Sequence, residues 1–486
     1  MGRKKCHRSI HNYDSSQKKK IPQIKRKEIS QQCENLLKLC SDPIYTTRLW
    51  ESYLEISSIL EKINRLEEMR MATTTPRAEA IMQFIEWLKS YGAMIEGVSI
   101  GEFAGFDLGI KAEKDYHANE LVLEIPRKVI FSIETAAPEL SSIANDPIIQ
   151  HMPQVALAIA LLVEKHRENS KWKPYLSVLP RTYNTVLYMS ARDMIELKGS
   201  PTLEVALKHC RNIARQYSYF NQMFQSNGSS NHVSQILKDV FTYEEYCWAV
   251  STVMTRQNII PSEHAGEMIH ALIPMWDMCN HEEGVITTDF NINSDMCECY
   301  VKREFKQGEQ IFINYGSRTN SDFFVHSGFV YPDNKNDGFK LRLGISKSDP
   351  LFQDRMKLLE KLEFPASNLS FLLNTTSEPI SDQMLAFLRV FSMRKFELDH
   401  WLESSKVLDL KHRDCALDTV VETNVRKFLL ARLKLLMANY PTTLEEDLKI
   451  LKTMMPPIGK MIVELRASEK KILSQAIDYV EQWVKA

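Results

Sequence analysis

Residues 273–284 read IPMWDMCNHEEG, and this stretch decides how the rest of the chain is interpreted. A Trp, an Asp, a Cys, an Asn and a His fall within the six positions 276–281, directly after an apolar run. Three kinds of site would use such side chains: a metal site, a nucleophile with its base, or a small-molecule site that needs no proton chemistry. Each makes a different demand on the surrounding sequence.

A metal site would combine Cys279 and His281 with Cys297 and Cys299 of the stretch DMCECYVKREF. Structural zinc sites favour Cys-x2-4-Cys and His-x3-5-His spacings, and a Cys-x-His pair is neither. Cys297 and Cys299 alternate along a strand-like run, so both lie on one face, where buried free cysteines behave as small hydrophobic side chains. The spacing therefore predicts no metal.

A covalent mechanism would require a base that faces the thiol of Cys279. His281 lies two positions further along the same strand-like segment, so its side chain points to the same face without meeting the thiol. The chain also contains no serine-elbow sequence. The interpretation that the sequence favours is therefore a ligand site without a nucleophile.

The chain as a whole has the composition of a large globular protein. Its 486 residues predict two or three domains, and 44% of them are apolar and 25% charged. The net charge of −1 does not indicate a nucleic-acid or membrane partner, and the apolar run 155–163 is too short to span a bilayer. We expect a monomer that requires no nucleic acid and no membrane.

Residues 1–27 form a basic segment with ten Lys or Arg against the single acid Asp14. A solvated, disordered arm is one interpretation of such a charge run, and a nuclear-import or RNA-contacting segment is another. The nine cysteines show no disulfide-like spacing and no apolar signal segment precedes them, which indicates a reducing compartment. We therefore expect a cytoplasmic protein, with the nucleus as a second location.

Helical and strand-like patterns alternate along the chain in large blocks. Apolar residues recur at helical spacing in 28–95, glycine-punctuated short strands follow in 96–131, and helical patterns return in 133–257. Residues 271–331 are strand-like again, and the pattern from about 345 onward is helical. A strand-rich unit is thus split by a helical insert.

Two ordered motifs connect these blocks to a known family. Asn280-His281 and, further along, GEQIFINYG at 308–316 resemble the two signature motifs of SET-domain methyltransferases. WKPYLSVLP at 172–180 and TTLEEDLKIL at 442–451 are similar to the insert and the C-terminal domain of the Rubisco lysine methyltransferase branch. Three stretches resemble one subgroup, the actin-histidine N-methyltransferases: VMTRQNIIP at 253–261, ALIPMWDMCNH at 271–281 and FLRVFSMR at 387–394.

The resemblance implies an α+β fold, with a β-rich SET domain split by a helical insert and followed by an all-α substrate-binding domain of the Rubisco-methyltransferase type. The expected parts are a basic disordered arm at 1–27, a helical lead-in at 28–95, the SET domain at 96–316 with its insert at about 133–257, a post-SET connection at 317–344 and the α-helical domain at 345–486.

The same resemblance implies S-adenosyl-L-methionine as the cofactor. Methyl transfer needs the acceptor in line with the sulfur–methyl bond, so the protein mainly positions the two ligands. The residues expected to bind the cofactor are Arg77, Ala104, Gly105, Phe106, Arg256, Asp277, Met278, Cys279, Asn280, His281, Ser327, Gly328 and Phe329. Asp107 stands where the family usually has glycine, and its Cβ would limit the approach of the backbone to the cofactor.

The subgroup implies a histidine ring nitrogen of actin as the methyl acceptor. Imidazole is mostly neutral near pH 7, so it needs control of its tautomer more than a base, and Asn258 would hydrogen-bond the nitrogen that does not react. Tyr315 would line the channel for the methyl group, which makes Tyr315 and Asn258 the expected catalytic residues. The residues expected to bind the substrate are Asn258, Ile260, Trp276, Ile313, Tyr315 and Arg318.

Other interpretations of these residues remain open. Tyr315 fits a core tyrosine with a hydrogen-bonded hydroxyl, and Asn258 fits a helix C-cap or a turn residue before Pro261. The SET resemblance also fits a lysine methyltransferase acting on a cytosolic protein or a histone. A SET-type binding module without catalysis is the third hypothesis.

Overall fold

The computed structural model describes residues 21–43, 46–67, 77–226, 231–264, 266–365, 369–415 and 417–483. Most of the predicted basic arm at 1–27 lies outside the described residues. Within the described segments, no helix has both the length and the apolar composition needed to cross a bilayer.

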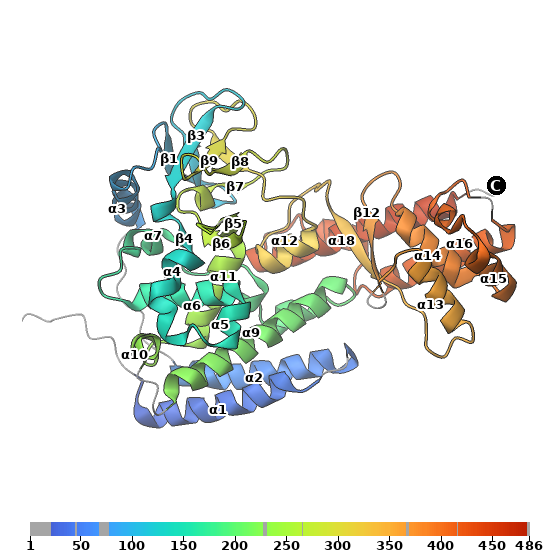
Figure 1. Cartoon of the computed structure of the whole chain (residues 1–486), viewed down its shortest axis with the longest axis horizontal. Coiled ribbons are helices and arrows are strands. Elements are labelled where there is room, and N and C mark those ends of the chain that lie inside the picture. The colour runs from blue at the N-terminus through green and yellow to red at the C-terminus, as the bar shows by residue number, and fades with distance from the viewer. Residues whose placement is uncertain are drawn as a thin grey trace, which may run out of the picture.

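The N-terminal lead-in is helical and contains α1 (Gln23–Ser41), α2 (Leu49–Glu67) and α3 (Arg77–Ser90). Tyr53, Ile56, Leu60 and Ile63 recur every three or four residues along α2 and are buried, as their spacing predicts. Helices α1 and α2 pack against α9 (Pro201–Gln225) along one flank of the molecule, whereas α3 lies apart from them beside α7 (Lys173–Val178) (Figure 1).

The β-rich unit consists of three small sheets (Figure 1). Their strand orders are β1-β2-β10-β7, β3-β9-β8 and β4-β6-β5. The strands are β1 (Val98–Phe103), β2 (Asp107–Ala112), β3 (Leu121–Pro126), β4 (Phe131–Ser132), β5 (Gln257–Pro261), β6 (Met268–Leu272), β7 (Asn280–His281), β8 (Thr288–Asn291), β9 (Met296–Tyr300) and β10 (Gln310–Ile313). The pairs in these sheets are antiparallel except for β7 with β10, which run parallel.

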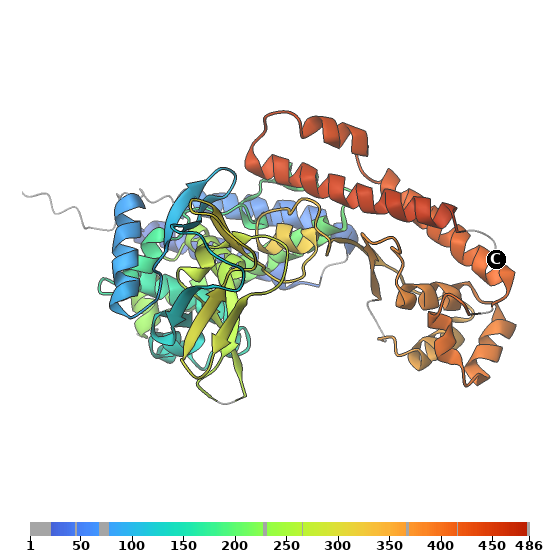
Figure 2. The same ribbon diagram turned by 90° about the horizontal axis from the view of Figure 1, so that it is seen from above.

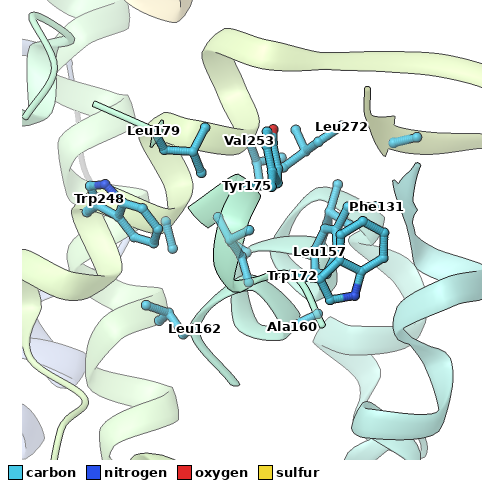
Figure 3. Packing of buried hydrophobic residues seen from close by; sticks show 14 of the residues in the cluster. Phe131, Leu157, Ala160, Leu162, Trp172, Tyr175, Leu179, Trp248, Val253 and Leu272 are labelled. Carbon is cyan, nitrogen blue, oxygen red and sulfur yellow. The ribbon is translucent and has the colours of Figure 1, made fainter. Parts of the chain in front are cut away.

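A helical insert connects β4 to β5. Its α-helices are α4 (Ile133–Leu140), α5 (Pro147–His151), α6 (Pro153–His166), α7 (Lys173–Val178), α8 (Ala191–Ile195), α9, α10 (His232–Leu237) and α11 (Tyr243–Arg256). Every residue of α6 from Val155 to Glu164 is buried, because neighbouring helices surround it. Trp172 packs edge-on against Phe131 of β4 at a ring distance of 5.0 Å and joins the insert to its sheet (Figure 3).

The C-terminal unit has its own hydrophobic core. Its elements are β11 (Gly338–Arg342), α13 (Phe352–Lys361), β12 (Ser370–Asn374), α14 (Asp382–Ser392), α15 (Lys395–Glu403), α16 (Thr419–Ala438), α17 (Leu444–Ile450) and α18 (Pro457–Glu481). It differs from the purely helical unit expected at 345–486: β12 pairs with β11, which lies in the stretch 317–344 expected to be a connection, and Phe371 and Leu373 alternate into the core. Alternation over five residues is a weak strand signal between long helices.

Helix α18 joins the two halves of the molecule. Its 25 residues rise by about 1.5 Å each, from beside α12 (Asn320–His326) to the helices of the C-terminal core (Figures 1 and 2). Buried charges hold it in place. Arg466 donates to Asp447 of α17 at 2.8 Å and to the carbonyl oxygen of Glu196 at 3.0 Å, and Lys470 donates to Asp447 at 2.7 Å.

A second contact between the halves centres on Glu469 of α18. Its carboxylate accepts hydrogen bonds from Ser200 at 2.8 Å, Thr202 at 3.0 Å and Tyr440 at 2.7 Å. Gly199 lies so close to the C-terminal unit that a Cβ there would be 2.9 Å from the Cα of Tyr440. The start of α9 therefore packs directly against the C-terminal unit.

Candidate active site

The two sequence motifs meet where β7 lies beside β10. In this parallel pair Asn280 is opposite Phe312 and His281 is opposite Ile313. The chain enters β7 through a tight turn at Met275, whose φ of +72° is unusual for a residue with a side chain. This register brings motifs that are distant in sequence to a single place.

Asn280 is anchored by its side chain. Its Nδ2 donates to the carbonyl oxygen of Leu108 on β2 at 2.9 Å. Gly109 gives this amide room, because a Cβ at that position would lie 3.1 Å from Nδ2 of Asn280 and 2.5 Å from Nε2 of Gln310. The hairpin β1–β2 and both motifs thus share one corner of the first sheet.

His281 is a neutral, buried ring. It is 8% exposed, and its Nδ1 accepts a hydrogen bond from the backbone N–H of Tyr315 at 3.1 Å. Burial and the nearby Lys302 lower its pKa to about 4, so the ring is uncharged at pH 7. The ring lies 4.8 to 6.1 Å from the rings of Tyr315, Phe323, Phe329 and Tyr331. His281 therefore organises aromatic walls and does not exchange protons.

The hydroxyl of Tyr315 is bound to the backbone. It donates to the carbonyl oxygen of Cys279 at 2.6 Å. Burial raises the pKa of this hydroxyl, although the positive charge of Arg256 opposes the effect, so the proton stays on the oxygen. Because that proton is directed at Cys279, the lone pairs of the oxygen are available to other neighbours.

Arg256 and Asp277 form a buried charge pair. Arg256 donates to the backbone oxygen of Asp277 at 2.8 Å and lies 3.4 Å from its carboxylate, which also accepts from Tyr175 at 2.5 Å. Burial raises the pKa of Asp277 and Arg256 opposes that effect. The other carboxylate oxygen, Oδ1, is buried and accepts no hydrogen bond from the described residues. This oxygen can accept a hydrogen bond from a ligand.

The loop after α12 forms another wall of the site. Helix α12 is capped at Ser327, whose N–H donates to the carbonyl oxygen of Phe323 at 2.8 Å. Gly328 has a φ of +74°, and a Cβ there would lie 3.0 Å from the carbonyl carbon of Asn184 in the insert. Phe329 then stacks on Phe323 at a ring distance of 4.7 Å. Glycine is required here for both conformation and space.

The β1–β2 hairpin contributes a further wall. Its turn contains Gly105 at φ +85° and Asp107 at φ +63°. Aspartate tolerates the left-handed region better than most residues with a side chain, so Asp107 keeps the backbone conformation that a glycine would supply. Phe106, which is 46% exposed, lies 5.4 Å from the ring of Phe312.

Together these groups enclose a cavity of about 720 Å³. Most of the residues expected to bind the cofactor line it, as does Tyr315: Gly105, Phe106, Arg256, Asp277, Met278, Asn280, His281, Ser327, Gly328 and Phe329. Ala104 and Cys279 do not line it. Arg77 is the first residue of α3, and its side chain lies outside the described residues.

The thiol of Cys279 is buried and is not placed for catalysis. Cys279 is 1% exposed and Cys299 is fully buried. A hydrogen bond with Cys299 and burial raise the pKa of the Cys279 thiol, which makes it a poor nucleophile. Within the described segments, no group of three or more His, Cys, Asp or Glu side chains is placed to hold a metal ion.

Two walls of the cavity were missed by the sequence analysis. The insert provides Val178, Pro180, Tyr183 and Asn184, and the start of α18 provides Met455, Pro457, Lys460, Met461 and Glu464. The insert residues lie in or next to the stretch 172–180 that resembles the family, so they could have been proposed from it. Nothing in the sequence near α18 indicates a ligand.

The residues expected to bind the substrate do not line this cavity, apart from Tyr315. Ile260, Trp276 and Ile313 are at most 5% exposed, whereas Arg318 is exposed. They lie near the cavity in sequence and in the sheets, because Trp276 precedes Asp277 and Ile313 pairs with β7.

The contacts of Asn258 match the interpretation of a capping residue. Asn258 lies on β5, and its Nδ2 donates to the carbonyl oxygen of Arg256 at the end of α11 at 3.2 Å. This bond satisfies a helix C-terminal carbonyl group, as a capping residue would. It also leaves Oδ1 as the acceptor atom of the side chain.

Several buried polar atoms of residues 257–277 have no hydrogen-bond partner in the part of the chain that the structure describes. Of the twelve such side-chain atoms in the described residues, four belong to residues 257–277: Gln257 Oε1, His270 Nδ1, Trp276 Nε1 and Asp277 Oδ1. Of these residues only Asp277 lines the cavity, and Gln257 and His270 lie on the face of the β5–β6 pair opposite to Asn258. Gln257 and His270 were not among the residues predicted from the sequence.

Comparison with protein families gives two matches. The SET domain family matches residues 107–316, and the Rubisco LSMT substrate-binding family matches residues 346–473. These two regions correspond to the sheets with their insert and to the C-terminal unit.

Similar proteins cover most of the chain. The actin-histidine N-methyltransferases of Homo sapiens and Gallus gallus are 38% identical to it over 463 residues, which is 93% of this chain and 77% and 78% of theirs. The relative from Xenopus tropicalis is 38% identical over 465 residues and is covered to 79%. Among solved structures, Rubisco LSMT bound to AdoMet superimposes with a TM-score of 0.69 at 24% identity, covering 84% of this chain and 92% of that one.

Proposed function

The chain belongs to the SET-domain family of the actin-histidine N-methyltransferases, and from this premise we propose that it transfers a methyl group from S-adenosylmethionine to a histidine ring nitrogen of actin. The observation that carries the proposal is the parallel pairing of β7 with β10, which gathers both SET motifs around one cavity.

The cavity fits this cofactor in size and in chemistry. Its volume of about 720 Å³ lies within the range of roughly 300–1,000 Å³ that is usual for small-molecule sites. S-adenosylmethionine supplies an electrophilic methyl group on a sulfonium centre. The Oδ1 of Asp277 would accept a hydrogen bond from its ammonium group, and Phe106 and Phe329 would pack against its adenine. Asn280 and the backbone of His281 would fix its position.

Asn258 would select the reactive tautomer of the substrate histidine. Because its Nδ2 is held by the carbonyl oxygen of Arg256, its Oδ1 is the atom that meets the substrate. An oxygen acceptor there binds the ring nitrogen that carries hydrogen and leaves the lone pair of the other nitrogen facing the methyl group. After the transfer the ring is a cation, and it releases its N–H proton to water.

Tyr315 would guide the methyl group without acting as a base. Its proton is directed at Cys279, and its pKa is raised by burial, so it cannot take up a proton. The lone pairs of the hydroxyl can accept weak C–H···O contacts from the polarised methyl group. The protein thus contributes position and orientation, which is what an in-line transfer requires.

Radioactive labelling tests the proposal directly. The purified chain is incubated with methyl-labelled S-adenosylmethionine and a histidine-containing actin peptide, and then with the same peptide in which that histidine is replaced. Label on the first peptide alone is expected. Equal labelling of both peptides would refute the histidine assignment, and label on a lysine would favour the lysine hypothesis.

We also propose a location and an oligomeric state for the enzyme. An actin substrate favours a cytoplasmic location, and a monomer with no nucleic acid stays our prediction. Size-exclusion chromatography with light scattering measures the oligomeric state, and a dimer would contradict the prediction.

A further inference from the structure

The candidate active-site cavity is lined by charges of both signs. Among the described residues, its lining holds three carboxylates, of Asp107, Asp277 and Glu464, and two permanent cations, Arg256 and Lys460. The buried histidine of β7 adds no charge, because its pKa of about 4 keeps it neutral at pH 7.

Two of these charges largely cancel. Asp277 and Arg256 are 3.4 Å apart, and Tyr175 donates a hydrogen bond to the same carboxylate. The side chain of Asp277 is 1% exposed and that of Arg256 is 15% exposed, so water does not separate them. The field of such a close pair falls off quickly with distance.

The negative charge of Glu464 is neutralised less completely than that of Asp277. The ion-pair partner of Glu464 in the described segments is Lys460, one turn earlier on α18, at 3.6 Å. The side chain of Lys460 is 57% exposed and that of Glu464 is 26% exposed, so water screens the cation more than the carboxylate. Burial raises the pKa of Glu464, an effect that Lys460 opposes. The carboxylate of Glu464 lines the cavity, so the charge that it carries acts on a ligand bound there.

The methyl donor and its product differ by one charge. During the transfer the lone pair of the ring nitrogen forms the new N–CH₃ bond. The sulfur–methyl bond breaks, and its electron pair stays on sulfur. The sulfonium of S-adenosylmethionine thus becomes the neutral thioether of S-adenosylhomocysteine, while the ammonium and carboxylate groups are unchanged.

We propose that Glu464 is a specificity-determining residue that makes the cavity prefer the methyl donor over the spent product, and that Lys460 weakens this preference. The inference rests on the proposed function, because it requires S-adenosylmethionine as the ligand. Coulomb attraction across a cavity of this size does not need direct contact between the carboxylate and the sulfonium. The residue comes from the last helix of the chain, so the C-terminal unit takes part in choosing the cofactor form.

Calorimetric titration tests this proposal on four forms of the full chain. The dissociation constants of S-adenosylmethionine and S-adenosylhomocysteine are measured for the wild type, Glu464→Gln, Lys460→Met and Glu445→Gln. Glu464→Gln is expected to lower the affinity ratio of donor to product by about threefold to tenfold, and Lys460→Met to raise it by about twofold to threefold. Glu445 is exposed on α17 and lines no part of the cavity, so Glu445→Gln should leave the ratio unchanged.

The affinity ratio of donor to product should fall in Glu464→Gln and rise in Lys460→Met. These opposite shifts would distinguish an electrostatic role of the two side chains from a structural one. A packing defect in α18 would weaken both ligands together and would not move the ratio in opposite directions. An unchanged ratio in Glu464→Gln, or shifts of the same sign in both variants, overturns the inference and leaves the proposed function standing. A wild type that binds no S-adenosylmethionine overturns both.

Discussion

Several residues at the site are defined by backbone conformation as much as by side-chain chemistry. Asp107 has a φ of +63°, a conformation that costs alanine more than it costs aspartate or glycine. The hydroxyl of Tyr315 keeps its proton and donates it in a hydrogen bond to the backbone oxygen of Cys279, so the lone pairs of the hydroxyl and not its acidity are used. At this scale the sequence supplies the identity of a residue, and the fold decides which of its atoms is used.

Replacing Asp107 separates backbone conformation from side-chain chemistry. Asp107→Ala should lower the free energy of unfolding by about 1 kcal/mol, because alanine enters the left-handed region at a cost. Asp107→Gly should fold at least as stably as Asp107→Ala. Urea unfolding of both variants measures the difference. A more stable alanine variant would contradict the strain argument.

Removing the hydroxyl of Tyr315 tests its proposed role. Tyr315→Phe should lower kcat by roughly tenfold or more, because the contacts that orient the methyl group are lost. The dissociation constant of S-adenosylmethionine should change much less, since the ring remains in place. Single-turnover methylation and calorimetry measure the two quantities. An unchanged kcat would show that Tyr315 is a core residue, as its alternative interpretation holds.

At the scale of elements, the fold of the β-rich unit follows from local patterns in the sequence. The helical spacing of α2, the alternation of Cys297 and Cys299 on β9, and the ordered motifs on β7 and β10 were readable because each is a short-range signal. The strand β12 was not readable, since five alternating residues lie between helices.

The candidate site was predictable only where its residues belong to a motif. Asn280, His281 and Tyr315 were found in this way, and the structure places them around one cavity. Glu464 and Lys460 were not found, because they reach the cavity through the packing of α18 and no local pattern records that contact.

The loop that joins α12 to the cavity depends on a glycine with no space beside it. Gly328→Ala should destabilise the fold and weaken cofactor binding, since its Cβ would meet Asn184 at 3.0 Å and its φ is +74°. Gly92 is a matched control, because its φ is +85° and nothing lies within 4 Å of the added Cβ. Gly92→Ala should therefore lower the free energy of unfolding by about 1 kcal/mol, through backbone strain alone.

Thermal unfolding and calorimetry on both glycine variants separate these effects. Gly328→Ala should unfold at a lower temperature than Gly92→Ala, and it alone should bind S-adenosylmethionine more weakly. Equal behaviour of the two variants would mean that the loop accommodates the added carbon.

At the scale of the whole molecule, stability depends on buried charges between the halves. Asp447→Asn should lower the free energy of unfolding by about 3–5 kcal/mol, because it leaves the buried Lys470 without its counter-charge and leaves Arg466 with Glu196 alone. Arg466 and Lys470 both donate to this carboxylate, and all three residues are at most 1% exposed. Glu61→Gln is the control, since Glu61 pairs with Arg65 on the surface at 3.8 Å. Urea unfolding compares the two variants, and similar midpoints would contradict the prediction.

The contact at Glu469 should make stability depend on pH. Burial raises its pKa from 4.5 to about 7, although three hydroxyl groups oppose that effect by donating to it. The folded chain then holds this proton more tightly than the unfolded chain. The associated stabilisation is complete below about pH 4.5 and is lost as the pH rises through about 7, by up to about 3 kcal/mol.

Unfolding by urea between pH 5 and pH 8 measures this dependence. The free energy of unfolding should fall across that window in the wild type and fall less in Glu469→Gln. Part of the slope should persist in the variant, because burial also raises the pKa of Glu67 to about 7. Identical slopes in both proteins would show that Glu469 does not titrate as its burial implies.

Helix α18 also sets the order in which the enzyme can mature during synthesis. The motif strands are translated well before Met461 and Glu464, which close the cavity, and before Arg466, which ties α18 to the insert. A nascent chain that exposes only the SET region therefore has an open cleft, because α18 has not yet been translated. The cavity is complete only after α18 has been synthesised and has packed against the insert.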